Sequence, residues 1–165
     1  MKSHFAMMAA YNAWANGRLL RMASQLPDEH YRRDVGAYFK SLHGTLNHLM
    51  VADRIWLRRL TGAGGQPSNL NAIVFADLPA LSAARRHEDQ RIVRFVASLS
   101  EAQLEERCDD RTLNGTPQQQ PRQEILAHLF NHQTHHRGQA HAILTVLGVC
   151  EPEGFDLLLM QRERG

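Results

Sequence analysis

Five of the ten histidines lie in one short stretch, HLFNHQTHHRGQAH, at residues 128–141. Apolar residues in and around this stretch recur at spacings of three and four, as on a helix that packs against its neighbours. His132 and His136 fall on this apolar seam, one helical turn apart, between Leu129 and Ala140. Side chains at i and i+4 have Cβ atoms about 6 Å apart, so both imidazoles can converge on one ion. The spacing therefore predicts half of a metal site.

The other histidines of this stretch are predicted to lie off the seam. His128 is one turn earlier and rotates away by about 40° per four-residue step, which favours a supporting or packing role. His135 and His141 are expected to be exposed, with His135 able to reach the edge of the site as a proton carrier. Surface positions are also expected for the histidines at a helix start, in a loop and among charges, namely His4, His30 and His87.

A third ligand must come from another helix, and the segment LHGTLNHLMVADRIWL at residues 42–57 offers two candidates. His48 lies midway along this segment, beside the apolar residues Val51 and Ala52. His43 is the rival, near the start of the helix. The residues alone leave His48 open as either a metal ligand or a satisfied core histidine.

Three neutral imidazoles would leave coordination positions open, as in catalytic rather than closed structural zinc sites. Such a site can act as a Lewis acid, or generate hydroxide or thiolate at neutral pH. Zn(II) and Ni(II) suit imidazole ligands best, and Fe, Co, Mn and Cu are also compatible. Four side chains are candidates for supporting polar contacts around the centre: Asn12, Thr45, His128 and Gln139.

Four long amphipathic segments are predicted to be the helices that position these residues: about 3–25, 37–60, 79–99 and 121–147. SEAQLEE at 100–106 predicts a short capping-box helix, and GFDLLLMQRER predicts a C-terminal one. Residues 108–120 contain Asn114-Gly115, typical of a tight turn or very short hairpin, but no sheet is predicted. Long connections follow the second helix and precede the fourth. The expected fold is all-α, a four-helix bundle in a single domain over residues 1–165.

Composition excludes several classes of protein. The net charge of +2, from 19 basic and 17 acidic residues, is too small to indicate a nucleic-acid partner. The arginines at 58–59 and 85–86 are expected on solvated helix faces. Cys108 and Cys150 are too few for a thiolate zinc site or a disulfide framework, which favours free thiols in a reducing compartment. No segment approaches the roughly 20 apolar residues of a membrane span. With no signal-peptide core at the N-terminus, a cytoplasmic location is expected.

Three motifs together resemble the DinB/YfiT-like superfamily of metalloenzymes over essentially the whole chain. They are YNAWANGRLL at 11–20, HLMVADRIWL at 48–57 and NHQTHHRGQ at 131–139. The resemblance implies a four-helix bundle with up-down-down-up topology and frequent homodimers. It also implies a divalent metal held by three histidines, which fall on His48, His132 and His136.

The resemblance implies a specific fold but leaves several kinds of activity open. Better-understood relatives are thiol-dependent transferases and isomerases that use bacillithiol, mycothiol or glutathione, although no clear thiol-recognition motif is visible here. A metal-dependent enzyme of the thiol-transferase or hydrolase type, acting on a small-molecule or thiol substrate, is the first hypothesis. The alternative is a non-catalytic metal-binding or stress-response protein, in which the ion ties two helices together. The family takes its name from a DNA-damage-inducible gene product, and that name does not imply DNA binding.

Overall fold

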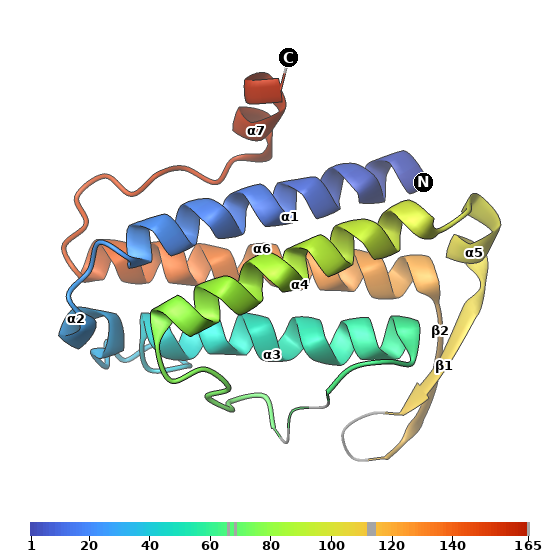
Figure 1. Ribbon diagram of the computed structural model, residues 1–165, viewed down its shortest axis with the longest axis horizontal. Coiled ribbons are helices and arrows are strands. Elements are labelled where there is room, and N and C mark those ends of the chain that lie inside the picture. The colour runs from blue at the N-terminus through green and yellow to red at the C-terminus, as the bar shows by residue number, and fades with distance from the viewer. Residues whose placement is uncertain (66, 68, 112–114, 165) are drawn as a thin grey trace.

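Helices make up most of the chain in a computed structural model that describes residues 1–65, 67, 69–111 and 115–164 (Figure 1). Four of the helices are long: α1 (Lys2–Ala23), α3 (Leu42–Thr61), α4 (Leu78–Ser98) and α6 (Arg122–Val146). Three are short: α2 (Asp28–Arg32), α5 (Glu101–Glu105) and α7 (Leu157–Arg164). The expectation of an all-α chain is confirmed, and each predicted helix has a counterpart. Among the described residues, no helix has the length and apolar character needed to cross a membrane.

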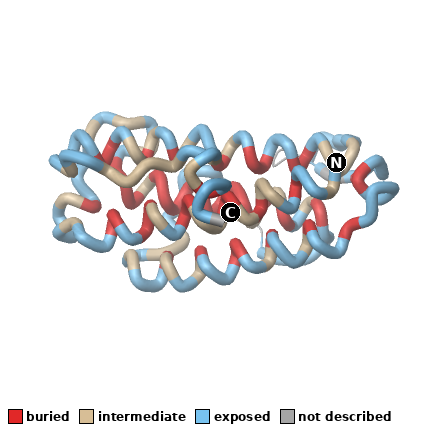
Figure 2. Tube along the Cα trace, turned by 90° about the horizontal axis from the view of Figure 1, so that it is seen from above, coloured by how far each residue is buried: buried red, intermediate tan, exposed pale blue. Residues whose placement is uncertain are grey.

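The four long helices lie side by side. Helix α1 packs against α4 and α6, and α3 packs against the same two helices. Figure 1 shows α3 and α4 running in one direction and α1 and α6 in the other. Buried residues gather on the inner faces of these helices, while the outer faces are exposed (Figure 2). The helices therefore enclose a shared interior.

Local signals in the sequence set the helix ends. The Ser41 side chain accepts a hydrogen bond from the backbone N–H of Gly44 at the start of α3, at 3.1 Å. Asp77 caps α4 in the same way. Gly62, with φ of 71°, ends α3 in the left-handed region that favours glycine. Ser100 and Gln103 form the predicted capping box of α5.

A two-stranded antiparallel hairpin, β1 (Arg107–Arg111) with β2 (Pro117–Pro121), connects α5 to α6. Of the two alternatives that the sequence left open, a tight turn or a very short hairpin, the structure has the hairpin, and its two strands form a sheet that was not predicted. The strands lack the alternating apolar pattern of a half-buried strand, because nearly all of their described side chains are exposed and only Cys108 is buried. Polar contacts, such as Gln119 Nε2 donating to Asp109 Oδ1 at 2.8 Å, cross between the strands instead. The predicted turn at 114–115 begins at a residue outside the described ranges.

In the described part of the chain, two large apolar clusters lie on either side of a polar layer, and a smaller third cluster joins α1 to α7. One large cluster joins the end of α1, the start of α3 and the end of α6, around Leu46 and Leu144. The other large cluster joins the opposite halves of these helices, around Phe5 and Leu126. Buried polar residues lie between them, and Arg85 is one of these, with only 3% of its surface exposed. The expectation that Arg85 faces solvent is wrong, because Asp53 and Asp89 are within ion-pair distance of its guanidinium.

Candidate metal centre

The structure brings three histidines from two helices together. His48 is on α3, and His132 and His136 are one turn apart on α6. The Nε2 atom of His48 lies 3.3 Å from Nε2 of His132 and 3.2 Å from Nε2 of His136. One ring nitrogen from each histidine lies within 4.8 Å of the others. These are the three residues to which the family resemblance points.

In two of the three histidines, a hydrogen bond on the side of the ring away from the cluster determines which nitrogen carries the hydrogen. His48 Nδ1 lies 2.9 Å from the carbonyl oxygen of Leu70, and His136 Nδ1 lies 2.7 Å from Oε1 of Gln139. Because oxygens of this kind only accept, each Nδ1 must carry the hydrogen. In a neutral ring the Nε2 atom then has a free lone pair. Two lone pairs therefore face each other across 3.2 Å with no hydrogen between them, an arrangement that a cation would stabilise.

The spacing of the nitrogens fits a metal ion. Zinc–nitrogen bonds of about 2.0–2.1 Å at tetrahedral angles place two ligand nitrogens about 3.3 Å apart. The two Nε2 separations from His48, 3.2 and 3.3 Å, agree with this value. The histidines could therefore bind an ion of this size with little rearrangement. The Nδ1 atom of His132 is buried and has no hydrogen-bond partner within the described part of the chain.

The surroundings keep all three rings neutral. Burial lowers the pKa of His48, His132 and His136. For His132 the pKa falls to about 3, because burial acts together with the nearby rings of the other two histidines. Neutral imidazole is the form that binds metal. At neutral pH, the cluster therefore offers three neutral nitrogen donors.

An aromatic ring covers one side of the cluster. The ring of Phe39 stacks on His48, with 3.9 Å between centroids and 17° between planes, and presents its face or edge to His136 at 5.5 Å. Phe39 belongs to a tight turn in which the Val35 N–H donates to the Lys40 carbonyl at 2.8 Å. The sequence alone does not point to Phe39, because nothing in the local pattern links this turn to a histidine nine residues later.

Gly44 allows this turn to lie directly against the first turn of α3. A Cβ atom at position 44 would lie 2.0 Å from the backbone oxygen of Phe39. Lys40, which follows Phe39, has a φ of 68°, in the left-handed region that is unusual for a residue other than glycine. The position of the Phe39 ring over His48 thus depends on a close backbone contact and on an uncommon backbone conformation.

The candidate supporting residues separate into two groups. Gln139 contacts the cluster through His136, and with Thr45 it lines a cavity of about 290 Å³ next to the Phe39 turn. His128 is exposed and packs on Trp56, with 4.5 Å between ring centroids, and its ring also lies 5.8 Å from that of His132 at the edge of the cluster. Asn12 points elsewhere, because α1 places it in the polar layer, where it donates to Asp89 at 3.2 Å.

The remaining histidines have other partners. His43 is buried at the start of α3, with Nε2 3.0 Å from the carbonyl oxygen of Phe75, so it fixes the connection before α4 and not the cluster. His135 is exposed, as expected, and its ring lies beside that of His136, 4.8 Å away. His141 was expected to be exposed but is partly buried, because its ring packs against Phe155 of the C-terminal segment. His4 and His87 are exposed, and His30 is partly buried.

The apolar residues of the expected seam on α6 are all buried, and the seam departs from the expected one only at the level of the histidine cluster. The fully buried positions at the level of the cluster are Gln133 and Arg137, whereas His132 and His136 are partly exposed beside them. A second set of residues at spacings of four and three carries this buried face: Leu126, Phe130, Gln133, Arg137, Ala140 and Leu144. The expected seam placed His132 and His136 at core positions, whereas the glutamine and the arginine beside them are the buried residues at that level.

Comparisons with known proteins agree with the resemblance seen in the sequence. The model of the DinB family matches residues 1–164. Protein DinB of Bacillus subtilis (strain 168) is 25% identical over 158 residues, which cover 90% of each of the two chains. The family match includes all three clustered histidines and both helices that carry them. The chain therefore belongs to the DinB family.

Proposed function

We propose that the Nε2 atoms of His48, His132 and His136 bind one divalent metal ion, and that the protein uses this ion in catalysis. The observation that carries the proposal is the pair of Nε2 lone pairs on His48 and His136, which face each other at 3.2 Å. The lowered pKa values support it, because the ligands would be ready to bind without first releasing protons. Zn and Ni fit three imidazoles best, and Fe, Co, Mn and Cu are compatible with the same donors.

The reaction class that fits best is transfer of a low-molecular-weight thiol to a small acceptor, or hydrolysis of a small substrate. A bound divalent ion with three neutral ligands supplies Lewis acidity and makes a coordinated thiol or water more acidic. Phe39 would exclude water from one side of the centre, where it stacks on His48. Gln139 would orient His136 by accepting its Nδ1 hydrogen. The partial exposure of His132 and His136 leaves a route for substrate.

Turnover assays test this function. Protein loaded with zinc or nickel would be assayed with a panel of low-molecular-weight thiols and an electrophilic aromatic acceptor, and with nitrophenyl esters for hydrolysis. We expect activity that is lost on chelation and in His136→Ala. His87→Ala is the matched control, because it removes an exposed histidine from α4 and should leave activity unchanged. Activity that survives in His136→Ala would exclude the proposed role of the cluster.

A second candidate function is a non-catalytic metal-binding or stress-response protein. It is favoured by the placement of the ligands on two helices, since an ion between them would tie α3 to α6. Here chelation would lower the melting temperature, while no thiol or ester in the panel would be turned over. Metal-dependent turnover would exclude this alternative.

We also propose the up-down-down-up arrangement of the family for the four long helices. The opposed directions of the helix pairs in Figure 1 support it. The homodimer and the cytoplasmic location stay predictions. Sedimentation equilibrium at micromolar concentration would test the first, with twice the monomer mass as the expected result.

A further inference from the structure

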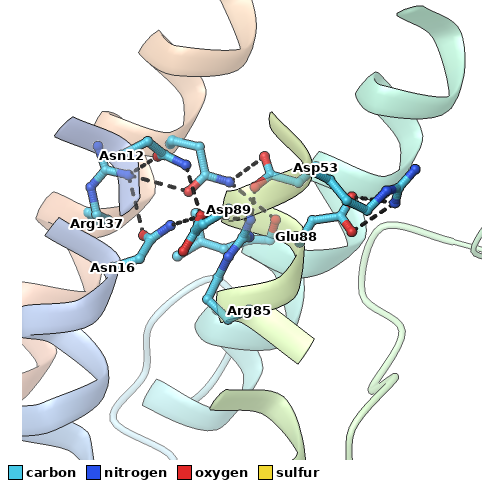
Figure 3. Close-up of polar contacts among 10 residues, drawn as sticks. Asn12, Asn16, Asp53, Arg85, Glu88, Asp89 and Arg137 are labelled. Atoms are coloured by element: carbon cyan, nitrogen blue, oxygen red, sulfur yellow. Dashed lines mark hydrogen bonds and ion pairs between the residues drawn. The ribbon is translucent and has the colours of Figure 1, made fainter. Parts of the chain in front are cut away.

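A layer of buried polar residues crosses the helix bundle between the two large apolar clusters (Figure 3). Each of the four long helices contributes to it. Its labelled members include Asn12, Asn16, Asp53, Arg85, Asp89 and Arg137. All of these side chains are less than 10% exposed. Burying so many polar groups costs free energy unless each finds a partner, so the contacts within the layer should be specific.

The layer is organised around two arginines. Arg85 lies between two carboxylates, 2.6 Å from Asp53 and 3.0 Å from Asp89. Arg137 lies beside no carboxylate within ion-pair distance among the described residues, and instead donates to the side-chain oxygens of Asn12 and Asn16. Both asparagines in turn donate to Asp89, at 3.2 and 2.9 Å. The two asparagines thus link the second arginine to Asp89, and Gln133, whose Oε1 accepts from Arg137 at 3.4 Å, links it to Asp53.

Gln133 connects this layer to the histidine cluster. Its Nε2 atom donates to Asp53 Oδ1 at 2.5 Å and to the backbone oxygen of Leu49 at 3.2 Å. Leu49 directly follows His48 on α3, and Gln133 directly follows His132 on α6. One buried amide group therefore joins the two helices at a point one residue away from a proposed ligand on each.

We propose that Gln133 is a positioning residue for the metal centre, which holds α3 and α6 at the separation that the three imidazoles require. The inference rests on the proposed metal site. A metal–nitrogen bond tolerates a deviation of only about 0.2 Å, so the spacing between the two helices must be fixed closely. The amide of Gln133 fixes it at the backbone of α3, and Asp53, held by Arg85, keeps the amide in place. Gln133 itself does not touch the metal.

Replacement of Gln133 in the full-length protein tests this role. Gln133→Met keeps an unbranched side chain of similar length but removes both hydrogen bonds to α3. Gln133→Asn keeps the amide but is one methylene too short to reach both partners, and it serves if the methionine variant does not fold. Asn16→Ala is the matched control, because it removes a buried amide from the same layer without touching the contact between α3 and α6. Urea unfolding of each metal-free variant reports its stability separately.

Titration with Co(II), followed by its visible absorption spectrum, measures both affinity and coordination geometry. We expect Gln133→Met to bind Co(II) about 10–100-fold more weakly than the wild type, as other residues that orient metal ligands do. Its spectrum should change shape, and Gln133→Asn should be intermediate. Asn16→Ala should lose stability but keep the wild-type affinity and spectrum.

The outcomes separate this inference from the proposed function. Failure of the wild-type protein to bind Co(II) would contradict the metal site itself. Wild-type binding with unchanged affinity and spectrum in both Gln133 variants would overturn the positioning role alone. An equal loss of affinity in Asn16→Ala would also overturn it, because the effect would then follow from general destabilisation of the layer.

Discussion

Replacement of Gly44 by alanine would test the contact that places Phe39 over the histidine cluster. The added Cβ atom would lie 2.0 Å from the Phe39 carbonyl oxygen, well inside van der Waals contact. The backbone of α3 fixes the position of this Cβ atom, and the carbonyl oxygen is itself a backbone atom. No side-chain rotation can therefore relieve the overlap. The turn at residues 35–41 would have to move outward by about 1 Å to restore a tolerable contact.

The expected cost follows from this displacement. Overpacking in a well-packed region destabilises a protein by about 1–3 kcal/mol. Alanine is a better helix former than glycine by about 0.5–1 kcal/mol in a helix interior, which offsets part of the loss. We expect a net loss of about 1 kcal/mol in the free energy of unfolding. For a chain of this length, that loss corresponds to a fall of about 2–4 °C in the melting temperature.

Thermal and urea unfolding of the metal-free protein would measure this effect. Gly17→Ala is the control, because Gly17 is exposed in the middle of α1 and an added Cβ there meets nothing within 4 Å. This variant should be more stable than the wild type by about 0.5–1 kcal/mol. In Gly44→Ala, the ring protons of His48 should also lose the upfield NMR shift caused by the stacked Phe39 ring. A Gly44→Ala protein as stable as Gly17→Ala, with unchanged His48 shifts, would show that the close contact at Gly44 does not hold Phe39 over His48.

Three further predictions concern charge and protonation. Arg85→Met leaves two buried carboxylates without their guanidinium, and should lower the free energy of unfolding in urea by about 3–5 kcal/mol. Gln139→Leu removes the acceptor for His136 Nδ1, and should weaken zinc binding in a competition titration about tenfold. The pKa of His132 is lowered from 6.5 to about 3 in the folded protein. Below pH 6.5 the unfolded chain therefore binds a proton at His132 that the folded protein does not. The contribution of His132 to stability is fully present above pH 6.5 and is lost as the pH falls. Between pH 7 and 5 the metal-free protein should lose less than about 1.4 kcal/mol per pH unit through this partly exposed group, and His132→Leu should flatten that slope in urea unfolding. Unchanged stability in Arg85→Met, unchanged zinc affinity in Gln139→Leu, or an unchanged pH slope in His132→Leu would each contradict the corresponding prediction.

The long helices could be predicted because their ends carry local signals. Ser41 and Asp77 cap α3 and α4, and Gly62 ends α3, each through contacts with neighbouring residues in the chain. The two strands at 107–121 could not be predicted in this way, although Asn114-Gly115 is typical of a tight turn or a very short hairpin. These strands are exposed and polar, so the apolar alternation that indicates a half-buried strand is absent.

The part of the candidate site that helix geometry determines could be predicted from the sequence. The four-residue spacing of His132 and His136 predicts that both rings lie on one face, and the structure has them on adjacent turns of α6. Their convergence with His48 depends on packing between α3 and α6, which only the family resemblance could indicate. Phe39 and Gln133 act through contacts between distant segments. No local pattern marks either residue, although the spacing of Gln133 from Phe130 and Arg137 is consistent with a buried helix face.

The most direct test of the central claim is the X-ray absorption spectrum of the zinc- or nickel-loaded protein, recorded at the edge of the bound metal. We expect one ion per chain with three imidazole ligands, at about 2.0–2.1 Å for zinc, and one or more additional light atoms. In His48→Ala, the imidazole contribution should fall or the ion should be lost. Fewer than three imidazoles in the wild type, a shell of protein sulfur, or the same spectrum in His48→Ala would contradict a centre built from His48, His132 and His136.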